Sequence, residues 1–188
     1  MGKHIAKGLK TCCDKIVTLS RAEFQFGNLA DYSKYSFSNS IIVDCISRID
    51  GSEVEVYDNN FVKLAGFIDF LKNQHQDFVY VYFSTLSTSD EKVKEQNHYV
   101  RSKADAENYI EKNIKEYRII QLSFPFGKGE SSQRLISRLI NKIKNNEKLV
   151  INDFSLSLMP INQLEIDSCE LILGSEKMVQ YLNTKYKA

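Results

Sequence analysis

The chain has 188 residues and a formal net charge of +1, with 25 Lys and Arg against 24 Asp and Glu. This length predicts one domain with a single sizeable core. The charge balance provides no overall field for nucleic acid, an anionic membrane or an acidic substrate, and so favours a small molecule or a protein as partner. No apolar stretch matches a signal peptide or a membrane span, so we expect a cytoplasmic protein.

Helical and strand-like patterns alternate along the first part of the chain. In order, they predict a helix from about residue 3, a short buried strand over Lys15–Leu19, a weak strand near Glu23–Phe26, a turn at Gly27–Asn28, a buried strand over Ile41–Ile46 and a helix with an apolar stripe from Phe61 to Leu71. The chain is thus expected to open on a helix.

The same alternation continues in the second part. It predicts a strand over Phe78–Phe83, a charged helix from about Asp90 to Tyr117, a strand over Arg118–Leu122, a helix with apolar positions from Leu135 to Ile143, a candidate strand over Val150–Asp153 and a candidate helix over Cys169–Leu182. We interpret the basic stretch Lys142–Lys148 as a solvated helix end. Strands that read as continuous apolar runs between helices predict an α/β fold, with a parallel sheet covered by helices on both faces.

The cysteines and histidines have no spacing that is typical of a metal site. Four cysteines are present and two are adjacent, at Cys12, Cys13, Cys45 and Cys169. We expect them to be reduced core residues, because this spacing suits neither a disulfide framework nor zinc. The histidines also lack partner spacing for a metal or a nucleophile triad, at His4, His75 and His98.

Tyr99 and Lys103 form the most informative pair in the sequence. The pair follows an apolar run that ends in Ser84 and Thr85, and the predicted helix around it is followed by another apolar run that leads into Phe124–Gly127. A second Tyr-x-x-x-Lys, at Tyr181, has neither flank, and short motifs of this kind also arise by chance. The four-residue spacing places both side chains on one face of the predicted helix, toward the sheet.

This pairing suggests acid–base chemistry. A free phenol has a pKa near 10, and an ammonium one helical turn away is expected to lower the pKa of Tyr99. Thr85 stands at the carboxyl end of the preceding strand, where open α/β sheets bind ligands, so its hydroxyl is a candidate substrate contact. A packed Tyr with a snorkelling Lys remains the structural alternative.

These residues resemble the short-chain dehydrogenase/reductase superfamily, in its extended epimerase/dehydratase branch, over most of residues 2 to about 170. The resemblance implies a Rossmann-like doubly wound parallel sheet, a nucleotide-sugar-like substrate and a nicotinamide cofactor that exchanges hydride. It implies proton transfer by Thr85, Tyr99 and Lys103. It also implies a possible homodimer, although the exposed face of the helix from Asp90 is mostly charged.

The resemblance also implies a set of cofactor contacts, which comprises Gly2, Arg21, Asn28, Leu29, Ser47, Ser84, Tyr99, Lys103 and Pro125. Asn28 stands where the family has Asp in its adenine-contact segment, and Asn60 matches the asparagine that opens the family's fourth helix. Arg21 stands where the family has an acidic residue for NAD or a basic residue near the 2′-phosphate of NADP, which slightly favours NADP.

The sequence departs from the family pattern in three places. The first strand and its glycine-rich turn should precede the first helix, and only Gly2 stands in the place of the last glycine. The spacing from Thr85 to Tyr99 is shorter than usual. Most of the substrate domain is absent, so we predict a single domain, 1–188, with a cofactor-type core over 1–129 and a reduced substrate region over 130–188.

Two consequences follow from these departures. Loss of the central strand would leave its neighbours either unpaired or re-registered against each other. Loss of the turn predicts weak cofactor binding, so two functional hypotheses stay open: an NAD(P)-dependent epimerase, dehydratase or reductase, and a degenerate noncatalytic module for binding or dimerisation. A third possibility is that the reading frame begins upstream of Met1 and includes the strand and the glycine turn.

Overall fold

A computed structural model describes residues 1–74, 77–128, 132, 134–149 and 157–181. Its helices are α1 (Gly2–Leu9), α2 (Leu29–Tyr32), α3 (Glu53–Tyr57), the π-helical turn η1 (Asp58–Val62), α4 (Lys63–Lys72), the 3₁₀ turn η2 (Leu86–Ser89), α5 (Glu91–Gln96), α6 (His98–Asn113), α7 (Leu135–Lys144) and α8 (Ile161–Leu173). Its strands are β1 (Ile41–Asp44), β2 (Val79–Thr85), β3 (Tyr117–Leu122), β4 (Phe124–Phe126), β5 (Leu158–Pro160) and β6 (Met178–Tyr181).

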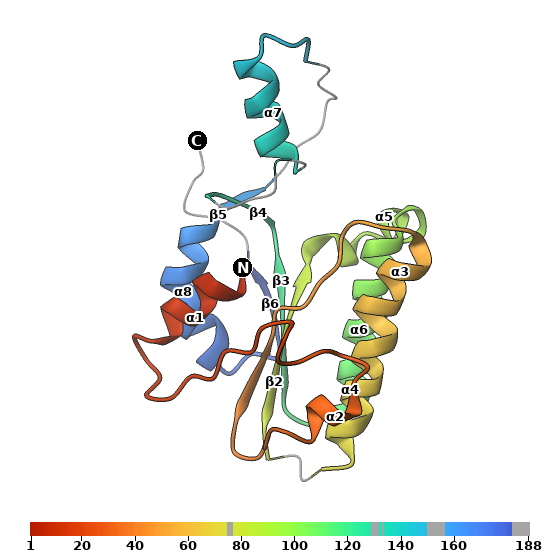
Figure 1. Ribbon diagram of the computed structural model, residues 1–188, viewed down its shortest axis with the longest axis vertical. Coiled ribbons are helices and arrows are strands. Elements are labelled where there is room, and N and C mark those ends of the chain that lie inside the picture. The colour runs from red at the N-terminus through yellow and green to blue at the C-terminus, as the bar shows by residue number, and fades with distance from the viewer. Residues whose placement is uncertain (75–76, 129–131, 133, 150–156, 182–188) are drawn as a thin grey trace.

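A parallel four-stranded sheet in the order β1-β2-β3-β6 forms the centre of the molecule. Helices α3, α4 and α6 cover one face, and α1 and α8 cover the other (Figure 1). Side chains alternate between these layers, so that Tyr80 and Tyr82 enter the core under α4 and α6 while Val81 and Phe83 enter the core under α1 and α8. The predicted α/β class, with a parallel sheet covered on both faces, is confirmed.

The predicted strands over Lys15–Leu19 and Glu23–Phe26 are wrong. The described sheet ends at β1, so a strand over Lys15–Leu19 has no neighbour to satisfy its backbone groups. Val17 is accordingly 66% exposed. Of the two outcomes expected for this segment, it is unpaired in the described sheet and not re-registered against β1. Phe24 packs instead among aromatic rings, with its centroid 5.4 Å from that of Phe67.

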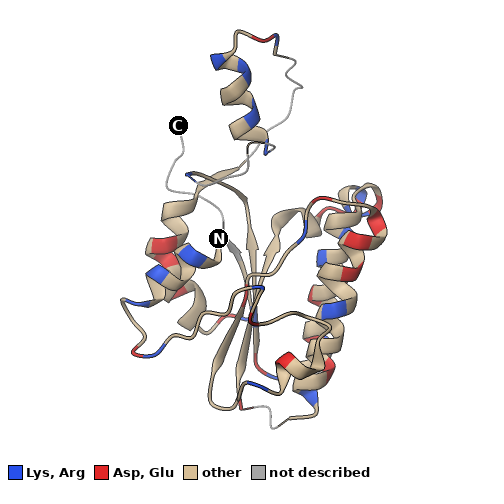
Figure 2. Ribbon diagram, in the orientation of Figure 1, with Lys and Arg blue, Asp and Glu red and all other residues tan. Residues whose placement is uncertain are grey.

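The charged helix predicted from Asp90 to Tyr117 is broken into two. Asn97 is extended between α5 and α6, and its side chain accepts hydrogen bonds from the backbone N–H groups of Tyr99 and Val100. An asparagine in this position is a strong helix N-cap, which explains the break. Acidic and basic residues both occur along α3 and α6 (Figure 2).

The C-terminal helix is displaced from its predicted position. Instead of a helix over Cys169–Leu182, α8 ends at Leu173 before Gly174, and the chain then forms strand β6 beside β3. Glycine commonly ends a helix. The four residues of β6 then pair with β3 as the edge strand of the parallel sheet, where Met178 is 44% exposed. Helix α7 lies where it was predicted, whereas Val150–Asp153 and Leu182 lie outside the described residues.

The prediction that all four cysteines are reduced is also wrong. A disulfide joins Cys12, just after α1, to Cys169 on α8, while Cys13 and Cys45 are free. Helices α1 and α8 lie side by side on the same face of the sheet (Figure 1), and their packing brings together two cysteines 157 positions apart. No local spacing could show this pairing, because tertiary packing alone sets the distance between the two Cα atoms.

Candidate functional site

The candidate site lies at the carboxyl end of the parallel sheet. Ser47 follows β1, Thr85 ends β2, and Phe124 follows β3. Tyr99 comes from the first turn of α6, and Arg134 is the N-cap of α7. Open α/β sheets bind ligands at this edge, because the strand ends and the helix starts meet there.

Burial dominates the electrostatics of the Tyr99 phenol. It raises the pKa of Tyr99 above 10, while the Ser47 hydroxyl and the Arg134 guanidinium lower it in part. Arg134 is held nearby, with its guanidinium carbon 5.1 Å from the centre of the Phe124 ring. The sequence predicted that Lys103 would lower this pKa. Instead the net direction is upward, and the cation that acts on the phenol is Arg134.

Lys103 lies inside the protein and is 1% exposed. Its ammonium donates a hydrogen bond of 2.6 Å to the carbonyl of Phe83 and lies 3.9 Å from the centre of the Tyr82 ring. Burial lowers the pKa of Lys103 to about 8, and the nearby charges of Asp44 and Glu107 oppose that fall. The Lys103 ammonium is therefore bound to the backbone of β2 inside the protein.

Asp44 and Glu107 are the buried acids beside Lys103. Asp44, at the end of β1, accepts hydrogen bonds from the Tyr80 hydroxyl at 3.1 Å and from the backbone N–H of Ile46 at 2.7 Å. Burial raises the pKa of both acids, and the Lys103 charge lowers it in part. Two acids and one ammonium thus share a water-poor space, where each ionised group stabilises its opposite.

Polar side chains from β3 and η2 complete this cluster around Glu107. Its carboxylate accepts hydrogen bonds from the Thr88 hydroxyl and from the Gln121 amide, both at 3.0 Å. The Ser84 hydroxyl lies beside Glu107 and lowers the pKa of that carboxyl. Ser84 therefore belongs to the interior cluster and not to the open edge of the sheet.

The Thr85 hydroxyl is partly engaged by its own backbone. It accepts a long hydrogen bond of 3.4 Å from the N–H of Ser87 and caps η2. An acceptor of this kind keeps its proton free to donate, so Thr85 can still bind a ligand oxygen. Pro125 lies in β4 and pairs with Met159 in β5.

Gly2 is the residue that the sequence analysis matched to the family's phosphate-binding turn. Gly2 begins α1, and a Cβ added there would make only an ordinary contact, 3.5 Å from the Cβ of Cys45. In a tight phosphate-binding turn a glycine is needed because no side chain fits. No atom of the described residues therefore requires a glycine at this position, and the predicted phosphate contact of Gly2 stays a prediction.

The residues predicted for the adenosine side are spread over the surface. Arg21 is exposed in a turn, and Leu29 is 66% exposed at the start of α2. Asn28 uses its side chain as the N-cap of α2, accepting from Ala30 N at 3.2 Å. Asn28 thus makes a local structural contact, and the predicted role of these residues in cofactor binding stays a prediction.

Asn60 ties the loop after β1 to the helical layer. Its side chain accepts from Arg48 N at 2.7 Å and donates to the Arg48 carbonyl at 2.8 Å. It also donates to Ser102 on α6 at 3.2 Å. Asn60 is 3% exposed within η1, and π-helical turns of this kind are often found near functional sites. It fixes the segment that carries Ser47.

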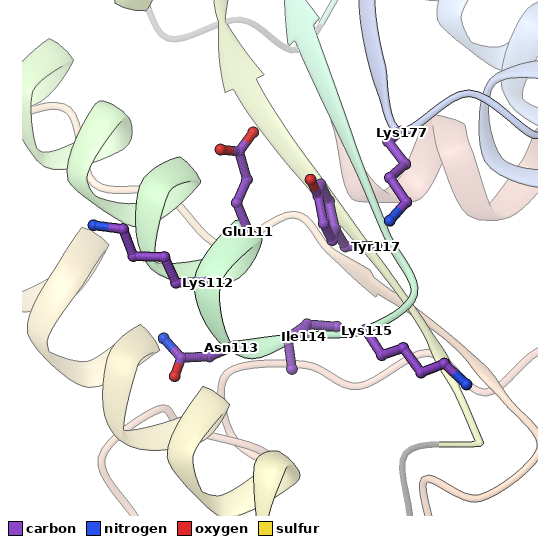
Figure 3. Close-up of a pocket in the computed structure, with 7 residues that line it drawn as sticks. All are labelled: Glu111, Lys112, Asn113, Ile114, Lys115, Tyr117 and Lys177. Atoms are coloured by element: carbon purple, nitrogen blue, oxygen red, sulfur yellow. The ribbon is translucent and has the colours of Figure 1, made fainter.

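A surface hollow lies at the other end of the sheet. It is a shallow hollow of about 470 Å³ around Tyr117, at the end of α6 and the start of β3 (Figure 3). The Lys177 ammonium lies 5.0 Å from the Tyr117 ring. Within the described ranges, no three His, Cys, Asp or Glu side chains are grouped to hold a metal ion. His75 lies outside those ranges.

Three residues of the site and its surroundings were missed by sequence reasoning. Asp44 is an acid at the end of an apolar strand. Because a buried charge is costly unless it is paired, its position indicates a nearby group of opposite charge. Glu107 follows Lys103 by four residues on the same helix face, which is a readable pairing signal. Arg134 had no such signal, because its approach to Tyr99 depends on how the chain returns after β4.

Solved structures of known enzymes have the same fold as this chain. The dTDP-4-dehydrorhamnose reductase from Clostridium acetobutylicum is similar with a TM-score of 0.79 and 17% identity, over 96% of this chain and 70% of that chain. The chain has the fold of the extended short-chain dehydrogenase/reductases. The reductase from Bacillus anthracis, in complex with NADP, has a TM-score of 0.74 and 20% identity, over 96% and 71%.

The likeness extends to an epimerase. A UDP-glucuronic acid 4-epimerase variant from Bacillus cereus, in complex with a UDP-sugar and NAD, has a TM-score of 0.62 and 16% identity, over 76% of this chain. This chain spans 54% of that enzyme. No family model matches the sequence, and no curated protein matches it. The structure holds no helix long and apolar enough to cross a membrane, among the residues that it describes.

Proposed function

We propose that this chain binds a nucleotide-sugar-like ligand at the carboxyl end of its sheet and does not catalyse hydride transfer. Hydroxyls of Ser47, Thr85 and Tyr99 stand at this edge to bind sugar oxygens. Arg134 supplies a cation for a diphosphate, which guanidinium groups bind well. Proteins of the same fold include a reductase and an epimerase of nucleotide sugars.

The observation that carries the noncatalytic part is the position of Lys103. Its ammonium donates to the Phe83 carbonyl within a buried space shared with Asp44. Acid–base work at neutral pH needs a phenol whose pKa is brought down toward 7, but burial raises that of Tyr99.

The second candidate is an NAD(P)-dependent epimerase, dehydratase or reductase. One observation favours it: Ser47 and Arg134 act on the Tyr99 phenol and lower its pKa against the effect of burial. Tyr99 would then donate or accept a proton at a sugar hydroxyl, with Thr85 orienting that hydroxyl. A nicotinamide group would supply hydride exchange, with a slight preference for NADP on the basis of Arg21.

A two-part experiment separates the candidates. Calorimetric titration with UDP-glucuronic acid and a dTDP-sugar is expected to show binding that weakens about tenfold or more in Arg134→Ala, through loss of a charge-assisted contact. The exposed Arg21→Ala serves as the matched control and should bind like the wild type. Absence of binding by the wild type would refute the proposed function.

Hydride transfer is measured on the same proteins with NAD(H) and NADP(H). The wild type and Tyr99→Phe are both expected to show no turnover. Turnover that is present in the wild type and lost in Tyr99→Phe would instead establish the enzymatic candidate. The cytoplasmic location, the homodimer and the division at residue 129 stay predictions, and light scattering at micromolar concentration tests the homodimer.

A further inference from the structure

Helix α7 stands apart from the two helical layers (Figure 1). No residue of α7, all of which the structure describes, is buried. Ile140 is 45% exposed and Ile143 is 59% exposed. The helix touches the site through its N-cap, Arg134. On its apolar side Leu135, Ile136 and Leu139 are half-buried, whereas Ile140 and Ile143 form an exposed apolar end. Such a face normally marks a place where another surface binds.

The apolar and basic side chains of α7 lie on different sides of the helix. At about 100° per residue, its five apolar residues occupy one arc of about 140°. They are Leu135, Ile136, Leu139, Ile140 and Ile143. Lys142 borders this arc on one side and Lys144 on the other, with Arg138 behind Lys142. This is the pattern of an interfacial helix, in which basic side chains flank an apolar face.

The charge of α7 is uncompensated. The helix contains Arg138, Lys142 and Lys144 and no acidic residue. No ion pair with a carboxylate engages these three cations within the described residues. Figure 2 shows α7 as a basic element, in contrast to the mixed charge of α3 and α6. The whole-chain charge of +1 therefore hides a local basic surface.

The charged and apolar side chains of α7 together indicate which class of partner it binds. A second copy of α7 would bring unbalanced cations together, because neither helix carries acids to pair with them. Nucleic acid would neutralise the cations but would leave the apolar arc in water. An anionic lipid surface suits both the apolar arc and the cations of α7. Its acyl chains would bury the apolar side chains, and its headgroups would pair with the flanking Lys and Arg.

We infer that α7 binds in the plane of an anionic lipid surface, with Ile140 and Ile143 toward the acyl chains and Arg138, Lys142 and Lys144 at the phosphates. This reverses the sequence expectation of no membrane partner, which rested on the charge of the whole chain. The inference is independent of the proposed ligand site, because it uses no residue assigned to that site.

Co-sedimentation of the full chain with vesicles tests the inference. Binding to mixed phosphatidylcholine–phosphatidylglycerol vesicles is expected to be about tenfold or more tighter than to phosphatidylcholine alone, and to weaken as salt is raised. The double variants Ile140→Ser/Ile143→Ser and Arg138→Glu/Lys142→Glu should each weaken binding about tenfold or more. All four positions are solvent-accessible, and a thermal melt of each variant confirms that it is folded.

Matched controls come from other helices. Ile166→Ser on α8 removes an apolar residue that is 69% exposed, and Lys92→Glu on α5 reverses an exposed cation, so both should bind vesicles like the wild type. Equal binding to neutral and anionic vesicles, no sedimentation at high lipid, or unchanged binding by both α7 variants would overturn the inference. So would vesicle-free self-association that the Ile140→Ser/Ile143→Ser change abolishes.

Discussion

Lys103 shows how one buried residue links stability to pH. Its folded pKa of about 8 lies below its ordinary value of 10.5, because burial disfavours the ammonium. Between these values the unfolded chain binds more protons than the folded one, so the free energy of unfolding contributed by this group rises with pH. We predict a rise of about 1–3 kcal/mol from pH 8 upward, which the Lys103→Met variant should lose. Urea unfolding at a series of pH values measures it.

The control for this residue-scale prediction is Lys112→Met, which removes an exposed lysine from the last turn of the same helix and should keep the wild-type slope. The measurement is best confined to pH 8 to about 9.5. At higher pH Tyr80 and Tyr82 ionise in the unfolded chain, near the ordinary pKa of about 10, whereas burial raises their pKa in the folded protein. If the free energy of unfolding changed with pH equally in the wild type and in Lys103→Met, Lys103 would have to be charged to the same extent in the folded and unfolded states.

At the scale of elements, Gly8 determines how closely α1 and α8 pack. A Cβ at Gly8 would lie 2.0 Å from the carbonyl oxygen of Glu165, so the helices would have to separate. Gly8→Ala is expected to lower the free energy of unfolding by about 1–3 kcal/mol. Gly66→Ala on α4 is the matched control, because no atom lies within 4 Å of its added Cβ. It should stabilise the protein by about 0.5–1 kcal/mol, through helix propensity. Denaturant unfolding compares the two, and equal effects would contradict the packing argument.

The same helix pair carries the Cys12–Cys169 disulfide. Closing a loop of this length restricts the unfolded chain, so reduction is expected to cost about 2–5 kcal/mol and lower the melting temperature. Thiol titration of the denatured protein should count two free cysteines without reductant, at Cys13 and Cys45, and all four after reduction. Four reactive thiols in the unreduced protein would show that the bridge does not form.

At the scale of the whole molecule, the described sheet ends at β1, and of the family's glycine-rich turn the sequence matches only Gly2, at the start of α1. Backbone contacts to a pyrophosphate contribute about 1.5–3 kcal/mol each, so the loss of two weakens binding by roughly two to four orders of magnitude. We predict that the protein is folded and binds neither NADH nor NADPH tightly. Cofactor fluorescence titration measures this, and a dissociation constant below about 10 μM would favour the enzymatic candidate.

Much of the fold was determined by the sequence alone. Continuous apolar runs predicted β1, β2 and β3, and the 3.6-residue stripes predicted α1, α4 and α7, because these periodicities depend only on local backbone geometry. Residues flanking Tyr99 and Lys103 correctly indicated an α/β sheet of the dehydrogenase/reductase type. The break at Asn97 was readable in principle, since asparagine is a strong helix cap.

Tertiary structure decided what those residues do. Lys15–Leu19 has a strand-like sequence but no neighbouring strand, and a strand needs a partner for its backbone groups. Spacing predicted that Lys103 serves Tyr99, but the ammonium lies against the Phe83 carbonyl beside Asp44. Helix periodicity fixes which face a side chain occupies. Which atom it meets there, and whether that atom is charged, depends on packing between segments that are distant in the chain.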